Sequence, residues 1–219
     1  MKNKFILLMA AVLSLGLLSC KSQLSVQAGN DDSAKVEFSI GFSKKTASML
    51  KELMGAVSQD SNADNSIITG QDVANLLRSV GTTDVKAAAK ADQVSANGTL
   101  KELSKTKIAS SKILSKTANS LTVSIGTEQI NSIYESMDEE SKSYFDLLMV
   151  PALTGEEMNV KEYNELLASV YGPELADEVT NGLLQIELKS PDGKKSVKDS
   201  ITLGQLLTSS TTKSWSVKW

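Results

Sequence analysis

Apolar and polar residues alternate along several short stretches of the chain, which is the period of a β-strand with one buried face. The alternation is clearest over residues 36–43, 121–125 and 184–188, and it returns over residues 215–219. Residues 190–193, with the sequence Ser-Pro-Asp-Gly, follow the third stretch and are typical of a tight turn. The pattern therefore predicts strands that turn one face to a common core.

Other stretches carry apolar residues every three or four positions, which is the period of a helix with one buried stripe. Residues 69–80 and 159–171 show this pattern. Asn159 and Glu162 are the residue types of a capping box at the start of the second stripe, and Gly172 marks its end. Both stretches are predicted to be amphipathic helices.

Shorter signals predict three more helices. A proline at the first position and a glycine at the last favour a helix over residues 173–182. Thr202 and Gln205 have the spacing of a second capping box, which predicts a short helix that begins there. A helix is also expected over residues 138–151, where the proline closes it.

The sequence is least informative over residues 82–119, where apolar side chains are sparse. Val85, Ala88 and Ala89 are compatible with a short helix. Residues 99–118 fit either a lysine-rich helix or an exposed hairpin, and the sequence leaves both open. The strands and helices together predict an α+β fold, in which an antiparallel or mixed sheet has helices packed on one face.

Short motifs recur in the same order along the chain. Residues 39–41, Ser-Ile-Gly, return as residues 124–126, and two longer motifs also return about 85 residues further on. The longer pairs are residues 68–80 with 158–170 and residues 91–98 with 176–182. This order predicts an internal duplication with halves at residues 36–118 and 119–219. The alternative is chance, because the chain is rich in Ser, Lys and Ala.

The first twenty residues have the form of an export signal. Lys2 and Lys4 precede an apolar run over residues 5–18, which is too short to span a membrane comfortably. The run ends in Leu17, Leu18, Ser19 and Cys20. This leader resembles the lipobox of bacterial lipoproteins, which are cut by signal peptidase II.

The resemblance implies that Leu17, Leu18 and Ser19 are recognised by the peptidase, that residues 1–19 are removed, and that Cys20 carries the lipid. Two or three acyl chains hold a protein stably on a membrane. The location implied is the cell envelope, facing the periplasm or the surface, and Lys21 favours the outer membrane in a diderm bacterium. The alternatives are a secretory signal with an incidental cysteine and a buried free cysteine.

The domain organisation predicted from these features has three parts. Residues 20–35 are small and polar and are expected to form a lipidated flexible tether. Residues 36–219 are expected to form the α+β body. The single cysteine leaves no internal disulfide in this body.

Charge is unevenly distributed along the chain, although the net charge is only -3. Residues 128–178 hold thirteen carboxylates against two lysines, whereas residues 86–116 hold seven lysines against two carboxylates. Residues 189–219 hold six lysines against two carboxylates. The lysine-rich segments would suit anionic lipid headgroups or an acidic partner, but solvated faces that complement each other within the fold are the favoured interpretation.

Composition excludes several kinds of catalytic site. The chain has no histidine, which rules out a Ser-His-Asp triad, a Cys-His dyad and any histidine-ligated zinc or haem. The carboxylates at residues 139–140 and 156–157 are sequence neighbours, which do not share a helix face. No enzyme is predicted. A carboxylate-based hydrolase is a weaker alternative, which requires separated acids such as Glu162 and Glu187 to converge in a cleft.

One motif is similar to part of a calcium loop. Asp60, Asn62 and Asp64 resemble the start of an EF-hand, but Gln71 stands where the loop needs a bidentate carboxylate. The residues that precede Glu162, which resembles the other end of such a loop, are also poor ligands. Capping boxes need the same residue types for a different reason. Neither a metal site nor a cofactor is predicted.

These features predict a membrane-anchored exported lipoprotein that acts as a non-catalytic binding or structural module of the envelope. Its expected partners are the membrane, through the lipid, and an envelope protein. The alternative is a carrier or receptor for a small or lipidic ligand, bound between sheet and helices. An enclosed apolar cavity would favour the carrier, and an exposed apolar patch would favour the interaction module. No nucleic-acid partner is expected, because the mature chain is acidic and exported.

Overall fold

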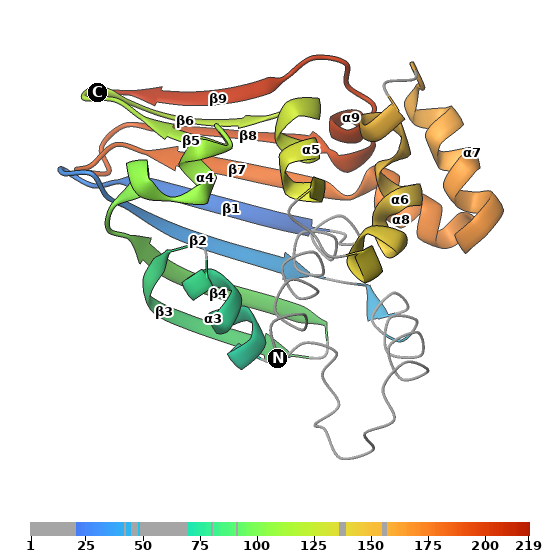
Figure 1. Ribbon diagram of the computed structural model, residues 1–219, viewed down its shortest axis with the longest axis horizontal. Helices are drawn as coiled ribbons and strands as arrows, with labels where there is room; N and C mark the ends of the chain where they lie inside the picture. Colours follow the sequence, from blue (N-terminus) through green and yellow to red (C-terminus); the bar gives the residue numbers. More distant parts are fainter. Residues whose placement is uncertain are drawn as a thin grey trace.

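The fold is α+β, as the sequence predicts, with a mixed sheet and accompanying helices (Figure 1). The computed structural model describes residues 21–41, 43, 44, 48, 70–79, 81–90, 92–135, 139–154 and 157–219. The predicted leader, with Leu17, Leu18, Ser19 and Cys20, lies outside the described residues. Within them, no helix is long and apolar enough to cross a membrane.

The larger sheet has six strands in the order β3-β4-β2-β1-β7-β8. Its strands are β1 (Lys21–Ala28), β2 (Ala34–Gly41), β3 (Thr82–Lys90), β4 (Gln93–Leu100), β7 (Leu183–Lys189) and β8 (Ser196–Thr202). β1 and β7 are parallel, and every other neighbouring pair is antiparallel, so the sheet is mixed. The alternation predicted over residues 36–43 and 184–188 thus corresponds to β2 and β7.

The smaller sheet has three strands in the order β5-β6-β9. Its strands are β5 (Leu114–Lys116), β6 (Ser120–Ile125) and β9 (Lys213–Lys218). The Trp215 indole on β9 donates a 2.8 Å hydrogen bond to the Asp199 carboxylate on β8, which ties the two sheets together. This bond, with a second from the Ser200 backbone N–H, holds the pKa of Asp199 below its usual value. Trp215 is therefore a packing residue, with 7% of its surface exposed.

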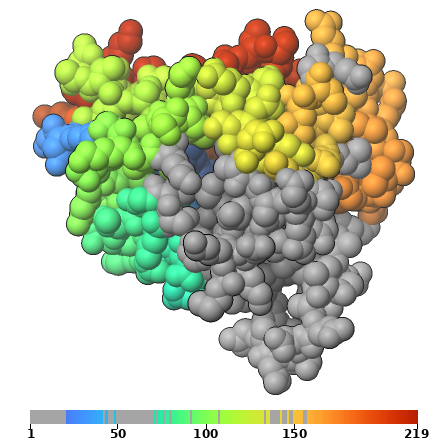
Figure 2. Space-filling view, in the orientation of Figure 1, coloured from blue at the N-terminus to red at the C-terminus, as the bar shows by residue number. Residues whose placement is uncertain are grey.

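The helices lie on one side of the larger sheet and around the end where β1 begins (Figure 1). They are α3 (Gly70–Ser79), the 3-10 turn η1 (Leu103–Lys105), α4 (Lys107–Ser110), α5 (Thr127–Glu135), α6 (Glu139–Thr154), α7 (Val160–Tyr171), α8 (Pro173–Asn181) and α9 (Leu203–Leu207). Figure 2 shows α3, α4 and α5 on the side of the molecule that carries the helices.

A continuous apolar core fills the space between the sheets and the helices. The larger sheet contributes Val26, Leu100 and Ile186, and the helices contribute Tyr163 and Leu167, all with at most 1% of their surface exposed. Burial raises the pKa of the Tyr163 hydroxyl far above its usual range. Close packing of this kind makes each large side chain worth several kcal/mol (roughly 2–5) to stability.

Both predicted capping boxes form at the described helix starts. The Asn159 side chain accepts hydrogen bonds from the backbone N–H groups of Lys161 and Glu162, at 3.0 and 3.1 Å, and Glu162 accepts one from the Asn159 N–H. Thr202 and Gln205 make the same reciprocal pair at α9. Residue 69, where the first predicted helix begins, lies outside the described residues.

The capping box of α7 gives a direct test of its contribution to stability. Asn159→Ala should destabilise the protein by about 1 kcal/mol, because two backbone N–H groups lose their acceptor. Urea unfolding followed by circular dichroism measures the change. Asn159→Asp is the control, since aspartate keeps the acceptor at the first turn, and an equal loss in both variants would contradict the capping role.

The predicted flexible tether is wrong over most of its length. Lys21–Ala28 forms β1, which lies between β2 and β7 in the larger sheet, and β2 already starts at Ala34. The buried side of β1 includes small and hydroxyl side chains such as Ser22 and Ala28, which makes its sequence look like a linker. The folded body therefore begins no later than Lys21.

The secondary structure of residues 82–119, where apolar residues are sparse, also differs from the prediction. Thr82–Lys90, where a short helix was compatible, forms strand β3, because pairing with β4 and packing of α3 outweigh the helix preference of alanine. Its exposure alternates, with Lys86, Ala88 and Lys90 exposed. Residues 99–118 form neither a single helix nor a simple hairpin, but the end of β4, η1, α4 and β5.

The predicted helix end at Pro151 lies one turn too early. α6 continues to Thr154 with Pro151 inside it. The Thr154 hydroxyl donates a 2.9 Å hydrogen bond to the Val150 carbonyl, which satisfies one of the last backbone acceptors of the helix. A proline near a helix end removes only one backbone bond, so the last turn tolerates it.

The predicted duplication is wrong as a description of the fold. Gln93 and Val94 lie in strand β4, whereas the matching Glu178 and Val179 lie in helix α8. The two halves also differ in the order of their elements, and strands from both contribute to the larger sheet. The recurring motifs therefore do not mark matching elements in the described residues.

Candidate functional site

The larger sheet has one apolar face and one polar face. Alternate residues of each strand point to opposite faces, so the neighbours of the core residues point away from the helices. The outward residues at the centre of the sheet are Gln23 and Ser25 on β1, Glu37 and Ser39 on β2, Ser95 and Asn97 on β4, and Lys86 and Ala88 on β3. This polar face is the best-formed hollow in the described part of the chain.

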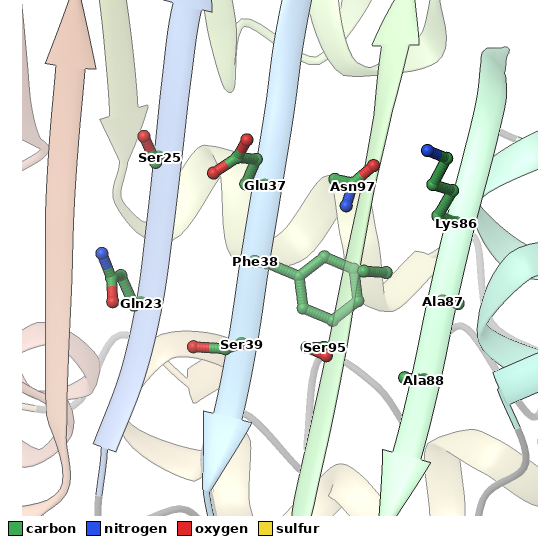
Figure 3. Close-up of a pocket in the computed structure, with 11 residues that line it drawn as sticks. Gln23, Ser25, Glu37, Phe38, Ser39, Lys86, Ala87, Ala88, Ser95 and Asn97 are labelled. Carbon is green, nitrogen blue, oxygen red and sulfur yellow. The ribbon is translucent and has the colours of Figure 1, made fainter.

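The side chains of this face surround a hollow with a volume of about 390 Å³. We call it the sheet groove. Phe38, Ala87 and Ala96 complete its lining from the positions between the outward residues. Figure 3 shows the side chains of four adjacent strands around it, with the helices behind the strands. The groove is open, and small side chains bring a ligand close to the sheet itself.

One cross-strand row defines the middle of the groove. Ser25 lies opposite Glu37, Glu37 lies opposite Asn97, and Asn97 lies opposite Lys86. An anionic and a cationic side chain therefore flank an amide, with two strand spacings, about 10 Å, between the strands that carry the charges. A second row, one step along the strands, places Gln23, Ser39 and Ser95 side by side.

The polar side chains of the sheet groove make no hydrogen bond or ion pair with any other residue that the structure describes. This holds for Gln23, Ser25, Glu37, Ser39, Lys86, Ser95 and Asn97. Their donors and acceptors are therefore available to water or to a ligand. A ligand that matched them would exchange water for direct bonds over four strands.

The next carboxylate on the same face, that of Glu187, has ion-pair partners within the sheet. Glu187 on β7 forms ion pairs with Lys189 at 3.1 Å and with Lys198 at 3.4 Å. Lys189 lowers the pKa of Glu187 through a hydrogen bond and through its positive charge, and Lys198 adds the same two effects. Glu187 is thus an ionised carboxylate paired with two lysines, whereas Glu37 forms no ion pair with a described residue.

The acids proposed for a hydrolase serve separate structural purposes. Glu162 accepts the Asn159 N–H at the start of α7, and Glu187 is held by two lysines on the opposite side of the sheet from the core. The calcium-loop motif at residues 60–64 lies outside the described residues. In the ranges that are described, no group of three or more potential metal ligands comes together.

An enclosed apolar cavity would distinguish a carrier, and an exposed apolar patch would distinguish an interaction module. The second hollow in the described ranges lies among the loops at the far end of the sheets, so neither of the two best-formed hollows lies between sheet and helices. Val170 on α7 is the one large apolar side chain that is strongly exposed among the residues described. The larger of the two hollows is lined mainly by polar residues.

The sequence contained only part of the signal for this site. The outward residues of β2 are visible as the polar half of its alternation, but nothing distinguishes them from ordinary solvent-facing positions. The sequence of β1 is typical of a tether and that of β3 is compatible with a helix, so it does not predict that their residues share these rows. Comparison of the chain with protein families, with curated proteins and with solved structures finds no match.

Proposed function

We propose that this protein is a membrane-anchored envelope lipoprotein that binds a polar segment of a partner protein in the sheet groove, without catalysis. The observation that carries the proposal is the set of seven polar side chains that line one hollow and have no partner among the described residues. The lipobox-like leader supports the anchored location.

The chemistry of the groove favours a peptide-like ligand. Glutamine and asparagine amides donate and accept at once, as the peptide group does, and serine hydroxyls adapt to either role. Glu37 offers a carboxylate to a basic side chain, and Lys86 offers an ammonium group to an acidic one. The outward side chains include no aromatic or large aliphatic group, which makes an apolar partner surface a poor fit.

A display library of peptides gives the test. Full-length protein in detergent micelles should select peptides that carry one basic and one acidic side chain. Glu37→Gln and Asn97→Ala should each weaken the selected peptides about tenfold or more, because a charge-assisted or amide hydrogen bond is lost. Fluorescence anisotropy of labelled peptides measures the affinity.

A matched control comes from the same face of the sheet. Gln185 on β7 points outward beside Gln23 but does not line the groove, so Gln185→Ala should leave the affinity unchanged. If no peptide is selected, or if Gln185→Ala weakens binding as much as Asn97→Ala does, the groove is not the binding surface and the proposal fails.

A further inference from the structure

The loops opposite the start of β1 meet around a second hollow, which we call the loop-end pocket. It has a volume of about 280 Å³. Its lining comes from four separate parts of the chain, namely Gly29, Asn30, Lys116, Ala118, Pro191, Asp192 and Trp219. Figure 1 shows the β1–β2 and β7–β8 turns beside the end of β9 at this edge. A hollow of this size is slightly below the usual range for drug-sized ligands, about 300–1,000 Å³.

Trp219 is the aromatic residue among those that line this pocket. It is partly buried and packs against the core. Its backbone N–H donates a 3.0 Å hydrogen bond to the Asn119 carbonyl, which fixes the residue just beyond β9. Trp215, two positions inward of Val217 on the same strand face, is buried in the core instead.

Three other residues that line the pocket are polar or charged, namely Asn30, Lys116 and Asp192. The Asn30 side chain is exposed and has no partner among the described residues. Asp192 is kept ionised, because hydrogen bonds from the Ser190 hydroxyl and the Lys194 backbone N–H lower its pKa. The residues that line the pocket thus carry an amide, a carboxylate, an ammonium group and one indole.

The pocket is held in shape before any ligand binds. Lys116 donates a 2.7 Å hydrogen bond to the Asp31 carbonyl, and Gln27 donates one of 3.1 Å to the Pro191 carbonyl. The Gly193 N–H donates a 3.0 Å hydrogen bond to the Ser190 carbonyl, which closes the turn at residues 190–193. Gly193 has a φ of 71°, a left-handed conformation that favours glycine. A preformed pocket loses less entropy when it binds.

We infer that the loop-end pocket binds a single sugar ring of a saccharide. The C–H face of a pyranose carries partial positive charge that the negative face of an indole attracts, while its hydroxyl groups need donors and acceptors at the ring edge. Trp219 supplies the first, and Asn30, Asp192 and Lys116 supply the second. The inference is independent of the sheet groove, which has no outward aromatic side chain.

The test uses full-length protein in detergent micelles and two probes, glucose and N-acetylglucosamine, at up to about 10 mM, where binding of one ring is measurable. Titration should change the tryptophan fluorescence and saturate. Trp219→Ala should abolish binding, and Asn30→Ala should weaken it about tenfold, since a hydrogen-bonding side chain is lost. Asn30 is exposed, so this variant keeps the fold even if Trp219→Ala does not.

The control lies on the neighbouring residue of the chain. Lys218 is exposed on the other face of β9 and does not line the pocket, so Lys218→Ala should bind both probes as the wild type does. Saturable binding that Asn30→Ala weakens and Asn97→Ala leaves unchanged would support the site. Binding of neither sugar, or binding that Asn30→Ala leaves intact, would overturn it, whatever the outcome of the peptide selection.

Discussion

Cys20→Ser should release the protein from membranes and abolish its labelling by a radioactive or clickable fatty acid. The proposed anchor needs the thiol of Cys20 to accept the lipid, and a serine hydroxyl cannot take its place. The loss of label should be complete, because the sequence contains no other cysteine. Fractionation of the expressing cells, followed by immunoblotting, measures the membrane-bound share.

The control for this substitution is Lys21→Ala, which alters the next residue and leaves the thiol in place. It should retain both the label and the membrane association. Acylation that persists in Cys20→Ser would contradict the assignment of Cys20 as the lipid anchor. A protein that is acylated at Cys20 but soluble would instead show that the acyl chains are not sufficient for anchoring.

Val26→Asp should unfold the protein, although the residue lies in a segment that looks like a linker. Val26 is 1% exposed, at the centre of β1 between β2 and β7. An unpaired carboxylate there would cost about 3–5 kcal/mol, a large part of the typical stability of a domain. Thermal unfolding followed by circular dichroism should show a fall in Tm of about 6–20 °C or no folded state at all.

Gln23→Asp is the matched control, because it places the same charge on the exposed face of the same strand. It should change Tm by no more than a few degrees, as surface substitutions do. A flexible tether would tolerate both substitutions equally. Equal tolerance would therefore contradict the presence of β1, and equal destabilisation would contradict the assignment of the two faces.

The strands that could be predicted from the sequence are those whose buried face is built from large apolar residues. Val36 and Ile40 of β2, and Ile186 and Leu188 of β7, make the alternation plain. The capping boxes were equally clear, because their chemistry is local: Asn159 needs only the three residues that follow it.

β1 and β3 could not be predicted because tertiary contacts, and not their own composition, make them strands. Four side chains of β1 face the core, but Ser22 and Ala28 contribute little hydrophobicity. β3 is rich in alanine, which prefers a helix when it is isolated. β1 owes its conformation to pairing with β2 and with the distant β7, and β3 owes its conformation to pairing with β4, the next strand along the chain.

The candidate sites were invisible for the same reason. The sheet groove requires β1, β2, β4 and β3 to lie in register, and the loop-end pocket requires Asn30, Lys116 and Asp192 to meet around Trp219. Single polar residues on strands or in turns are common, so their positions in the sequence carry no signal until the topology brings them together.

The parallel pairing of β1 with β7 has a consequence for how the chain reaches its native state. The two strands come from near opposite ends of the described chain, and the pair Leu24 and Ile186 closes a loop that contains most of the protein. Contacts between such distant segments form late and slowly, because the entropy of closing the loop is lost before any contact is gained. β1 is synthesised before β7 and cannot complete its pairing until β7 has followed. Until then its open edge is a site for association with other chains, so a holding chaperone should matter for the yield of this protein.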